Sequence, residues 1–123
     1  MVLKKKCLDT YALAEIAQGN SHFTTYLNQE IIITEITLAE FYAVLLREEG
    51  ENIAESWLKK LTPYTMPVKL NILIEAVKFR YQHRQQNISF FDAVGYIYSL
   101  NFGYLFVTGD KEFEHLKNVE FRK

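Results

Sequence analysis

Short apolar runs alternate along this chain with longer stretches in which apolar residues recur at helical spacing. Val2–Leu8 is expected to form a first strand, Ile31–Ile33 is a β-branched run typical of a strand buried on both faces, and Tyr104–Val107 is a short, fully apolar strand. Val119–Phe121 predicts an edge strand. Strands that alternate with helices pair in parallel through right-handed crossovers. The pattern therefore predicts a three-layer α/β/α fold with a central, mainly parallel sheet of about four to five strands.

The helical stretches share an apolar face and end at Gly, Pro or polar residues. They cover Tyr11–Ala17, a short helix capped by Ser21, Thr37–Arg47, Ile53–Leu61, Leu70–Tyr81, Phe90–Leu100 and a short helix at Lys111–Leu116. Pro63 and Pro67 mark a turn, and residues 82–87 are expected to form a polar loop. A chain of 123 residues without a linker or repeat is expected to form one domain over residues 1–123.

The composition narrows the setting in which the chain is expected to work. Cys7 is the only cysteine, so an internal disulfide is excluded, and the sequence has no spacing typical of a zinc site. No apolar run approaches the roughly 18 residues of a membrane span. A cytoplasmic protein without a membrane segment is expected. The net charge of -1 argues against strong nonspecific binding to long duplexes.

Four acidic residues stand where a predicted strand ends or the next helix begins. They are Asp9, Glu40, Asp92 and Asp110. Ligands of open α/β sheets bind at the carboxyl ends of the strands, so these side chains are expected to meet at one edge. Carboxylates that meet repel one another and raise each other's pKa unless a cation lies between them. A hard divalent cation, Mg²⁺ or Mn²⁺, satisfies that requirement.

Each of these acids also has a purely structural explanation as a helix cap. Asp9 and Asp110 precede helices, where Asp is a good N-cap. Thr37 with Glu40, and Ser89 with Asp92, have the spacing of capping boxes. Ser, Thr or Asn would cap equally well without mutual repulsion, so four acids at four junctions favour a shared site.

A divalent cation held by carboxylates points to hydrolysis of a phosphodiester by a metal-activated water. Thr108 lies two residues before Asp110, where its hydroxyl is a candidate accessory group for a water or a phosphate oxygen. An ordinary turn residue is an equally good explanation of Thr108. Thr10, Glu35 and Glu112 lie near the same predicted edge and are further accessory candidates.

Four stretches of this sequence together resemble the PIN domain, the small α/β nuclease fold of VapC-type toxins and RNA-processing endonucleases. They are Leu8–Leu13, Thr34–Glu40, Phe91–Tyr96 and Leu105–Phe113. The resemblance implies that Asp9, Glu40, Asp92 and Asp110 hold Mg²⁺ or Mn²⁺, with Thr108 as the accompanying hydroxyl. It also implies an RNA substrate, a homodimer and, for a toxin, an antitoxin partner. The region from Asn52 to Tyr81 contains none of the four acids and would serve dimerisation or partner binding.

The leading hypothesis is a metal-dependent endoribonuclease, either the toxin of a toxin–antitoxin pair or an RNA-processing nuclease outside any such system. The first alternative is a noncatalytic PIN-like module that binds RNA or protein and uses the acids only as caps. The second is a phosphatase-like domain with Asp9 as nucleophile, which lacks the second Asp expected two residues further on.

Overall fold

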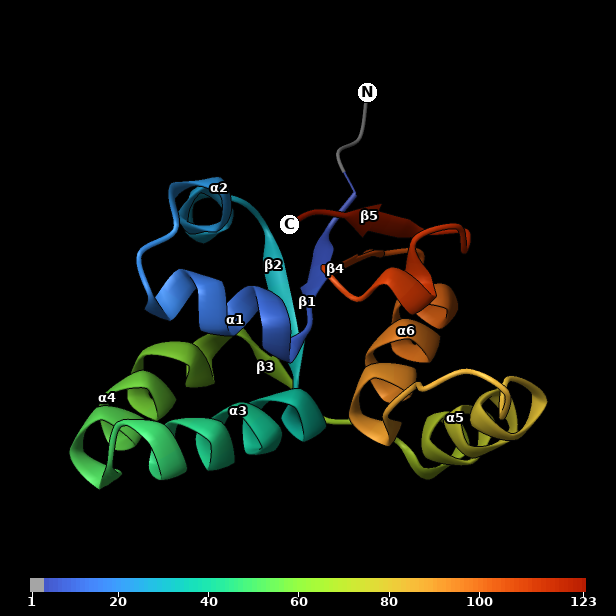
Figure 1. Ribbon diagram of the computed structural model, residues 1–123, viewed down its shortest axis with the longest axis horizontal. Helices are drawn as coiled ribbons and strands as arrows, with labels where there is room; N and C mark the ends of the chain where they lie inside the picture. Colours follow the sequence, from blue (N-terminus) through green and yellow to red (C-terminus); the bar gives the residue numbers. More distant parts are fainter. Residues whose placement is uncertain (1–3) are drawn as a thin grey trace.

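The computed structural model describes residues 4–123, which fold around one central sheet (Figure 1). Within these residues the sheet has five strands in the order β3-β2-β1-β4-β5, and every neighbouring pair is parallel. The strands are β1 (Lys6–Leu8), β2 (Ile31–Thr34), β3 (Thr65–Met66), β4 (Leu105–Thr108) and β5 (Val119–Phe121). This confirms the predicted α/β class and parallel sheet. The first two residues of the predicted strand Val2–Leu8 lie outside the described residues.

Helices cover both faces of the sheet and form the outer two layers. The α-helices are α1 (Thr10–Ala17), α2 (Ser21–Thr24), α3 (Glu35–Glu48), α4 (Glu51–Leu61), α5 (Leu70–Gln82) and α6 (Phe90–Phe102). Three 3-10 turns, η1 (Thr25–Asn28), η2 (Thr62–Tyr64) and η3 (Lys111–Phe113), complete the connections. Helices α1 to α4 lie on one side of the sheet, and α5 and α6 lie on the other (Figure 1). No helix among residues 4–123 has the length and apolar character needed to cross a membrane.

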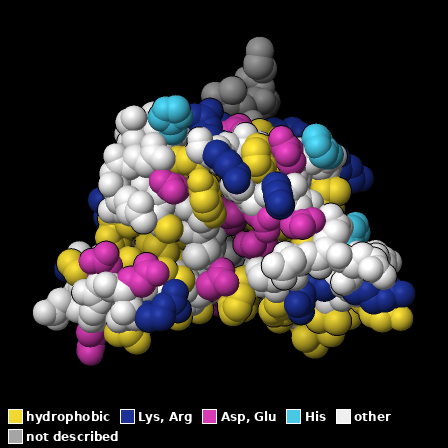
Figure 2. Space-filling model, viewed as in Figure 1, with side chains coloured by type: hydrophobic (Ala, Val, Ile, Leu, Met, Phe, Trp, Pro, Cys, Tyr) yellow, Lys and Arg dark blue, Asp and Glu magenta, His cyan; other side chains and the backbone are white. Residues whose placement is uncertain are grey.

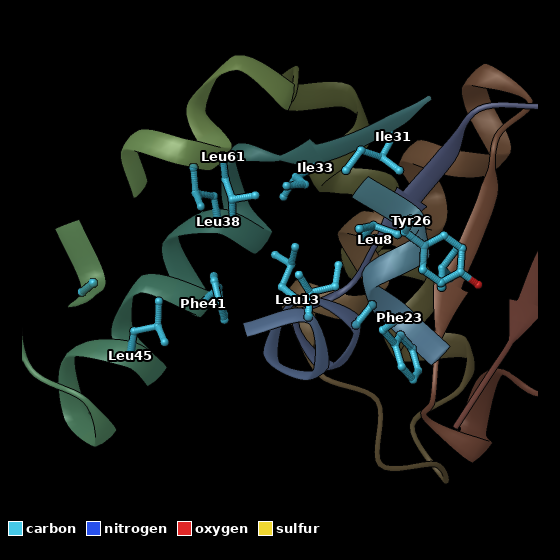
Figure 3. Packing of buried hydrophobic residues seen from close by; sticks show 14 residues of the cluster. Leu8, Leu13, Phe23, Tyr26, Ile31, Ile33, Leu38, Phe41, Leu45 and Leu61 are labelled. Atoms are coloured by element: carbon cyan, nitrogen blue, oxygen red, sulfur yellow. The ribbon is translucent and has the colours of Figure 1, made fainter. Parts of the chain in front are cut away.

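Alternating side chains of the strands divide the core into two clusters. Leu8 of β1 and Val107 of β4 face the α1–α4 layer, whereas their neighbours Cys7 and Phe106 face α5 and α6. The first cluster packs around α1 and α3 and includes fully buried Phe23 (Figure 3). Burial on both faces explains why the strands are almost wholly apolar.

The second cluster is rich in aromatic rings. Phe79, Tyr96, Phe106 and Phe113 lie with ring centroids 5.3 to 6.4 Å apart, which ties α5, α6 and η3 to β4. Gly95 lies where α6 crosses Phe106, and a Cβ atom there would stand 2.7 Å from Cε1 of that ring. The glycine therefore permits the close approach of α6 to the sheet.

The strand register brings two chain-distant junctions to the same edge. Leu8 of β1 pairs with Val107 of β4, and the Asp9 amide donates a hydrogen bond to the Val107 carbonyl at 3.1 Å. Both strands run in the same direction, so Asp9 and Thr108 leave the sheet side by side. This register is the basis of the candidate site.

Several local predictions were wrong in detail. Helix α3 begins at Glu35 rather than Thr37, because the Thr34 hydroxyl accepts the Thr37 amide at 3.1 Å and caps the helix three residues earlier. The cap of α2 is Asn20 rather than Ser21. The predicted helix Lys111–Leu116 is only the 3-10 turn η3. Strand β3 was not predicted, because two residues between prolines carry too little pattern to identify a strand.

Candidate functional site

Asp9 is a buried carboxylate at the carboxyl end of β1. Only 1% of the residue is exposed, and its Oδ1 accepts the Ala12 amide at 2.8 Å, so it caps α1 as predicted. Burial is the largest cause that raises the pKa of Asp9, and the negative charges of Asp92 and Asp110 also raise it. The Thr108 hydroxyl and the Ala12 amide lower it, and the resulting pKa is about 8. The side chain is therefore both a cap and a carboxylate in need of a cation.

Asp92 occupies the first turn of α6, the helix that starts beside β1 and β4. Its amide donates to the Ser89 hydroxyl at 3.1 Å, which confirms the predicted cap at Ser89. Burial, the largest cause, and the charges of Glu40 and Asp110 together raise the pKa of Asp92 to about 7. This carboxylate thus lies within electrostatic reach of two other members of the predicted set.

Asp110 and Thr108 form a compact turn after β4. Thr108 is fully buried, and its hydroxyl oxygen accepts the Asp110 amide at 3.0 Å. The same hydroxyl lies near enough to the Asp9 carboxyl to lower its pKa. Oδ1 of Asp110 in turn accepts the Glu112 amide at 3.0 Å and caps η3. Thr108 therefore fixes the turn that carries Asp110 against the end of β1.

Glu40 is not the capping-box residue that its spacing predicted. Because Thr34 caps α3, Glu40 lies in the second turn, and its Oε1 accepts a hydrogen bond from the hydroxyl of Thr10 on α1. Its charge raises the pKa of Asp92, so the two carboxylates lie within electrostatic reach of each other. A helix cap does not explain this acid.

The four predicted acids are linked pairwise by their charges: Asp92 and Asp110 raise the pKa of Asp9, and Glu40 and Asp110 raise that of Asp92. Acidic side chains collect in the middle of one face of the molecule, with basic side chains close by (Figure 2). In residues 4–123 none of the four forms an ion pair with Lys or Arg. As placed, no three Asp, Glu, His or Cys side chains of the described part come close enough to hold a metal ion. The predicted acids therefore interact through their charges, but their side chains do not form a closed metal-coordination site.

The chemistry of these donors fits a hard divalent cation. All of them are carboxylate or hydroxyl oxygens, which Mg²⁺ and Mn²⁺ prefer, and no nitrogen or sulfur donor stands among them. Two of the carboxylates have raised pKa values that a bound cation would lower again. Mg²⁺ keeps several water ligands and needs only one or two direct carboxylates, so an open arrangement is compatible with it.

Glu35 and Glu112, the two accessory acids predicted near this edge, form hydrogen bonds with residues outside the four-acid set. Glu35 accepts the Val68 amide at 3.0 Å and so braces the segment between β3 and α5. Glu112 accepts the side-chain amide of Gln86 at 2.9 Å and links η3 to the loop before α6. Thr10, by contrast, contacts Glu40 directly. Of the accessory candidates other than Thr108, only Thr10 therefore touches one of the four acids.

One feature of the site was missed from the sequence. The ring of Tyr11, two residues after Asp9, packs onto Gly109, where a Cβ atom would stand 2.4 Å from its Cε1 atom. The ring of Phe23 on α2 holds Tyr11 from another side, with centroids 5.7 Å apart. Tyr11 and Gly109 both stand near predicted acids, but a contact across 98 positions leaves no local pattern.

Comparison with solved structures shows that the chain shares its fold with proteins of the VapC type. VapC20 of Mycobacterium tuberculosis, described as a toxin that cleaves the sarcin–ricin loop, superposes with a TM-score of 0.77 at 19% identity, over 96% of this chain and 99% of that one. DNA-bound VapBC of Salmonella typhimurium gives a TM-score of 0.76 at 16% identity, over 98% of each chain. A toxin–antitoxin complex of Klebsiella pneumoniae gives 0.74 at 17% identity, over 94% and 95%.

The two comparisons by sequence give different results. No curated protein gives a significant match to this chain. The model of the family described as "PIN domain" matches residues 6–119, which span all five strands from β1 to the start of β5. That match extends over nearly the whole described structure and includes the four acids at the sheet edge. The chain belongs to the PIN domain family.

Proposed function

We propose that this protein is a metal-dependent endoribonuclease whose Asp9, Glu40, Asp92 and Asp110 hold Mg²⁺ or Mn²⁺. The observation that carries the proposal is the opposition of the buried Asp9 and the partly buried Asp92, two carboxylates whose charges repel and which have no Lys or Arg partner among residues 4–123. A divalent ion bound there supplies an activated water and charge stabilisation for phosphodiester hydrolysis. The residues of the chain provide the anionic pocket and its geometry.

The protein's own contribution is to hold these oxygens in place. Asp9 is fixed by its bond to the start of α1, and the Thr108 hydroxyl fixes the turn of Asp110. Thr10 fixes Glu40 from the same turn of α1. Such partners orient the ligand oxygens, and their removal typically weakens a metal site about 10- to 100-fold.

Caps alone do not account for the arrangement. Asp9 and Asp110 do cap helices, as the noncatalytic alternative requires. Glu40 caps nothing, however, and its charge is directed at Asp92. In a noncatalytic scaffold without a bound cation, the repulsion between Glu40 and Asp92 would only destabilise the fold. The catalytic hypothesis is therefore favoured.

RNA as substrate, and a role as a toxin, are supported by the structural relatives. VapC20 is described as cleaving the sarcin–ricin loop, and the complex from Klebsiella pneumoniae is a toxin–antitoxin pair. We infer that this chain is the toxin of such a pair and acts on RNA in the cytoplasm.

The nuclease proposal is tested with Asp92→Asn and Asp9→Asn proteins on end-labelled single-stranded RNA. Each variant should lose Mg²⁺- or Mn²⁺-dependent cleavage and saturable Mn²⁺ binding in calorimetry, while circular dichroism stays native. The control is Glu35→Gln, which removes an acid of the same edge that instead bonds to Val68. Full activity of purified Asp92→Asn protein, or metal-independent cleavage by the wild type, would refute the proposal.

A groove between α1, α3 and α4 is proposed to receive the antitoxin. It holds about 310 Å³ and is lined by Ala14, Ala17, Phe41, Leu45, Ile53 and Trp57. Glu48 and Glu49 lie on its border, so an amphipathic segment with apolar and basic residues is its complement. Such a segment would lie along α3, the helix that carries Glu40.

A homodimer through α5 is the second proposed assembly. Leu70, Ile74, Val77 and Tyr81 form an exposed stripe on this helix, each between 47% and 70% accessible. Their intervals of four, three and four residues read the same in both directions. A two-fold interface brings the same patch of two subunits together in opposite directions, which this symmetric stripe satisfies. Glu75 and Lys78 beside it would meet opposite charges on the second copy.

A further inference from the structure

Tyr11 is an aromatic side chain beside the candidate site that keeps part of its surface open. It lies in the first turn of α1, two residues after Asp9, and 36% of it is exposed. Its aromatic neighbour Phe23 is completely buried. An exposed tyrosine ring so close to buried carboxylates calls for an explanation other than core packing.

The ring is held in a fixed position by the second acid-bearing loop. Gly109 lies between Thr108 and Asp110, and a Cβ atom built on it would fall 2.4 Å, 2.7 Å and 2.8 Å from three carbons of the Tyr11 ring. The backbone of Gly109 is not in the left-handed region, so conformation does not require glycine there. The missing side chain makes room for the ring instead.

Phe23 of α2 contacts the Tyr11 ring from a second side. Its ring meets that of Tyr11 at 71° with centroids 5.7 Å apart, an edge-to-face contact that resists rotation of the tyrosine about its side-chain bonds. A pre-ordered ring loses little entropy when a flat ligand stacks on it. Tyr11 is thus a rigid, partly open aromatic surface between the two junctions that carry Asp9 and Asp110.

We propose that Tyr11 is a positioning residue that stacks on one unpaired base of the RNA and so aligns the adjoining phosphate with the acidic site. This inference rests on the proposed ribonuclease function. Stacking needs a base that is free of its helix, so the residue selects single-stranded or looped RNA over duplex. Tyr11 would stack on any of the four bases without distinguishing them, because every base has a flat aromatic face.

The test measures binding without cleavage. The Asp92→Asn protein, which should not cleave RNA, is titrated with single-stranded oligoribonucleotides that carry the fluorescent base 2-aminopurine at successive positions. One position should show quenching that Tyr11→Phe preserves and Tyr11→Leu abolishes, with affinity lowered between about fivefold and about 100-fold by Tyr11→Leu. With an abasic nucleotide at that position, the Tyr11→Leu protein and its parent should bind equally.

The matched control is Tyr64→Leu, because Tyr64 is 38% exposed but lies on η2, before β3 and away from the acidic edge. It should leave binding and quenching unchanged. A second variant, Gly109→Ala, should displace the ring and lower affinity when Tyr11 is present, but should have little effect in a Tyr11→Leu background. Thermal melting of each variant shows whether a loss of RNA binding comes from loss of the Tyr11 ring or from loss of the folded structure.

The outcomes distinguish this inference from the function on which it rests. If the protein with an intact Tyr11 binds no RNA, the ribonuclease proposal and the stacking proposal both fail. If RNA binds normally and Tyr11→Leu changes neither affinity nor quenching, only the stacking proposal fails. Equal losses in Tyr11→Leu and Tyr64→Leu would also overturn it.

Discussion

The hydroxyl of Thr10 donates a hydrogen bond to the carboxylate of Glu40, thirty residues further along the chain. The contact joins the first turn of α1, which follows Asp9, to the second turn of α3. It leaves the other oxygen of Glu40 free of this bond. The position of Glu40 in the site therefore depends on a side chain from a different helix.

Loss of the Thr10 hydroxyl should therefore weaken the site. Thr10→Val keeps the shape of the side chain but removes the donor, so we expect a fall of about 10- to 100-fold in Mn²⁺ affinity, measured by calorimetry, and a matching fall in RNA cleavage. Thr10→Ser, which retains the hydroxyl, should recover most of both. Unchanged metal affinity in Thr10→Val would show that Glu40 does not depend on this bond.

Glu40 also illustrates the limit of reading caps from sequence. Thr34 and Thr37 both precede helical residues, and both have the side chain of an N-cap. The spacing to Glu40 favoured Thr37, but Thr37 already lies inside the helix, and Thr34 at the end of β2 takes the cap. Local spacing cannot decide between two competent caps, because the choice depends on where the strand ends.

The response of stability to metal should depend on pH. The pKa of Asp9 is about 8 and that of Asp92 about 7 in the folded protein, both raised from 3.8 by burial and neighbouring acids. Raised values mean that the folded state holds protons that the unfolded state releases, so metal-free stability should fall as pH rises from about 4 to about 8. Bound Mg²⁺ requires the ionised carboxylates.

We therefore expect the increase in Tm caused by Mg²⁺ to be larger at about pH 9 than at about pH 6, as followed by scanning calorimetry. Asp92→Asn removes one of the opposing charges, so the metal-free variant should melt higher than the wild type above about pH 7 and respond less to Mg²⁺. A wild-type response that is equal at both pH values would contradict the assignment of these two acids as ligands.

Asp9 and Asp110 were predictable because each follows an apolar run that identifies a strand, and Asp92 because it follows the helix cap Ser89. The order of those runs also indicated a parallel sheet, and with it the shared edge of Asp9 and Asp110. Contacts made by side chains of different elements were not predictable. The packing of Tyr11 onto Gly109 depends on the register of β1 with β4, which pairs Leu8 with Val107 and carries no local signal.

Because α6 packs closely against the sheet at Gly95, even the smallest enlargement of this residue should destabilise the protein. In Gly95→Ala the new methyl would stand 2.7 Å from the Phe106 ring, which is fully buried and cannot move freely. Overpacking costs about 1 to 3 kcal/mol, against a gain of about 1 kcal/mol in helix propensity. We expect a net loss of stability in urea unfolding. Phe106→Leu makes room for the methyl, so Gly95→Ala should cost less in that background.

The stripe on α5 predicts the behaviour of the protein in solution. Val77 is 51% exposed at the centre of the stripe, next to Ile74 across the proposed two-fold axis. Val77→Glu would place two like charges in an apolar contact and should convert the dimer to a monomer in sedimentation analysis, with the fold of each subunit otherwise native. Leu46→Glu is the matched control, because Leu46 is 47% exposed but lies on α3. It should leave the dimer intact, whereas a wild-type protein that is monomeric at all concentrations would exclude α5 as a self-association surface.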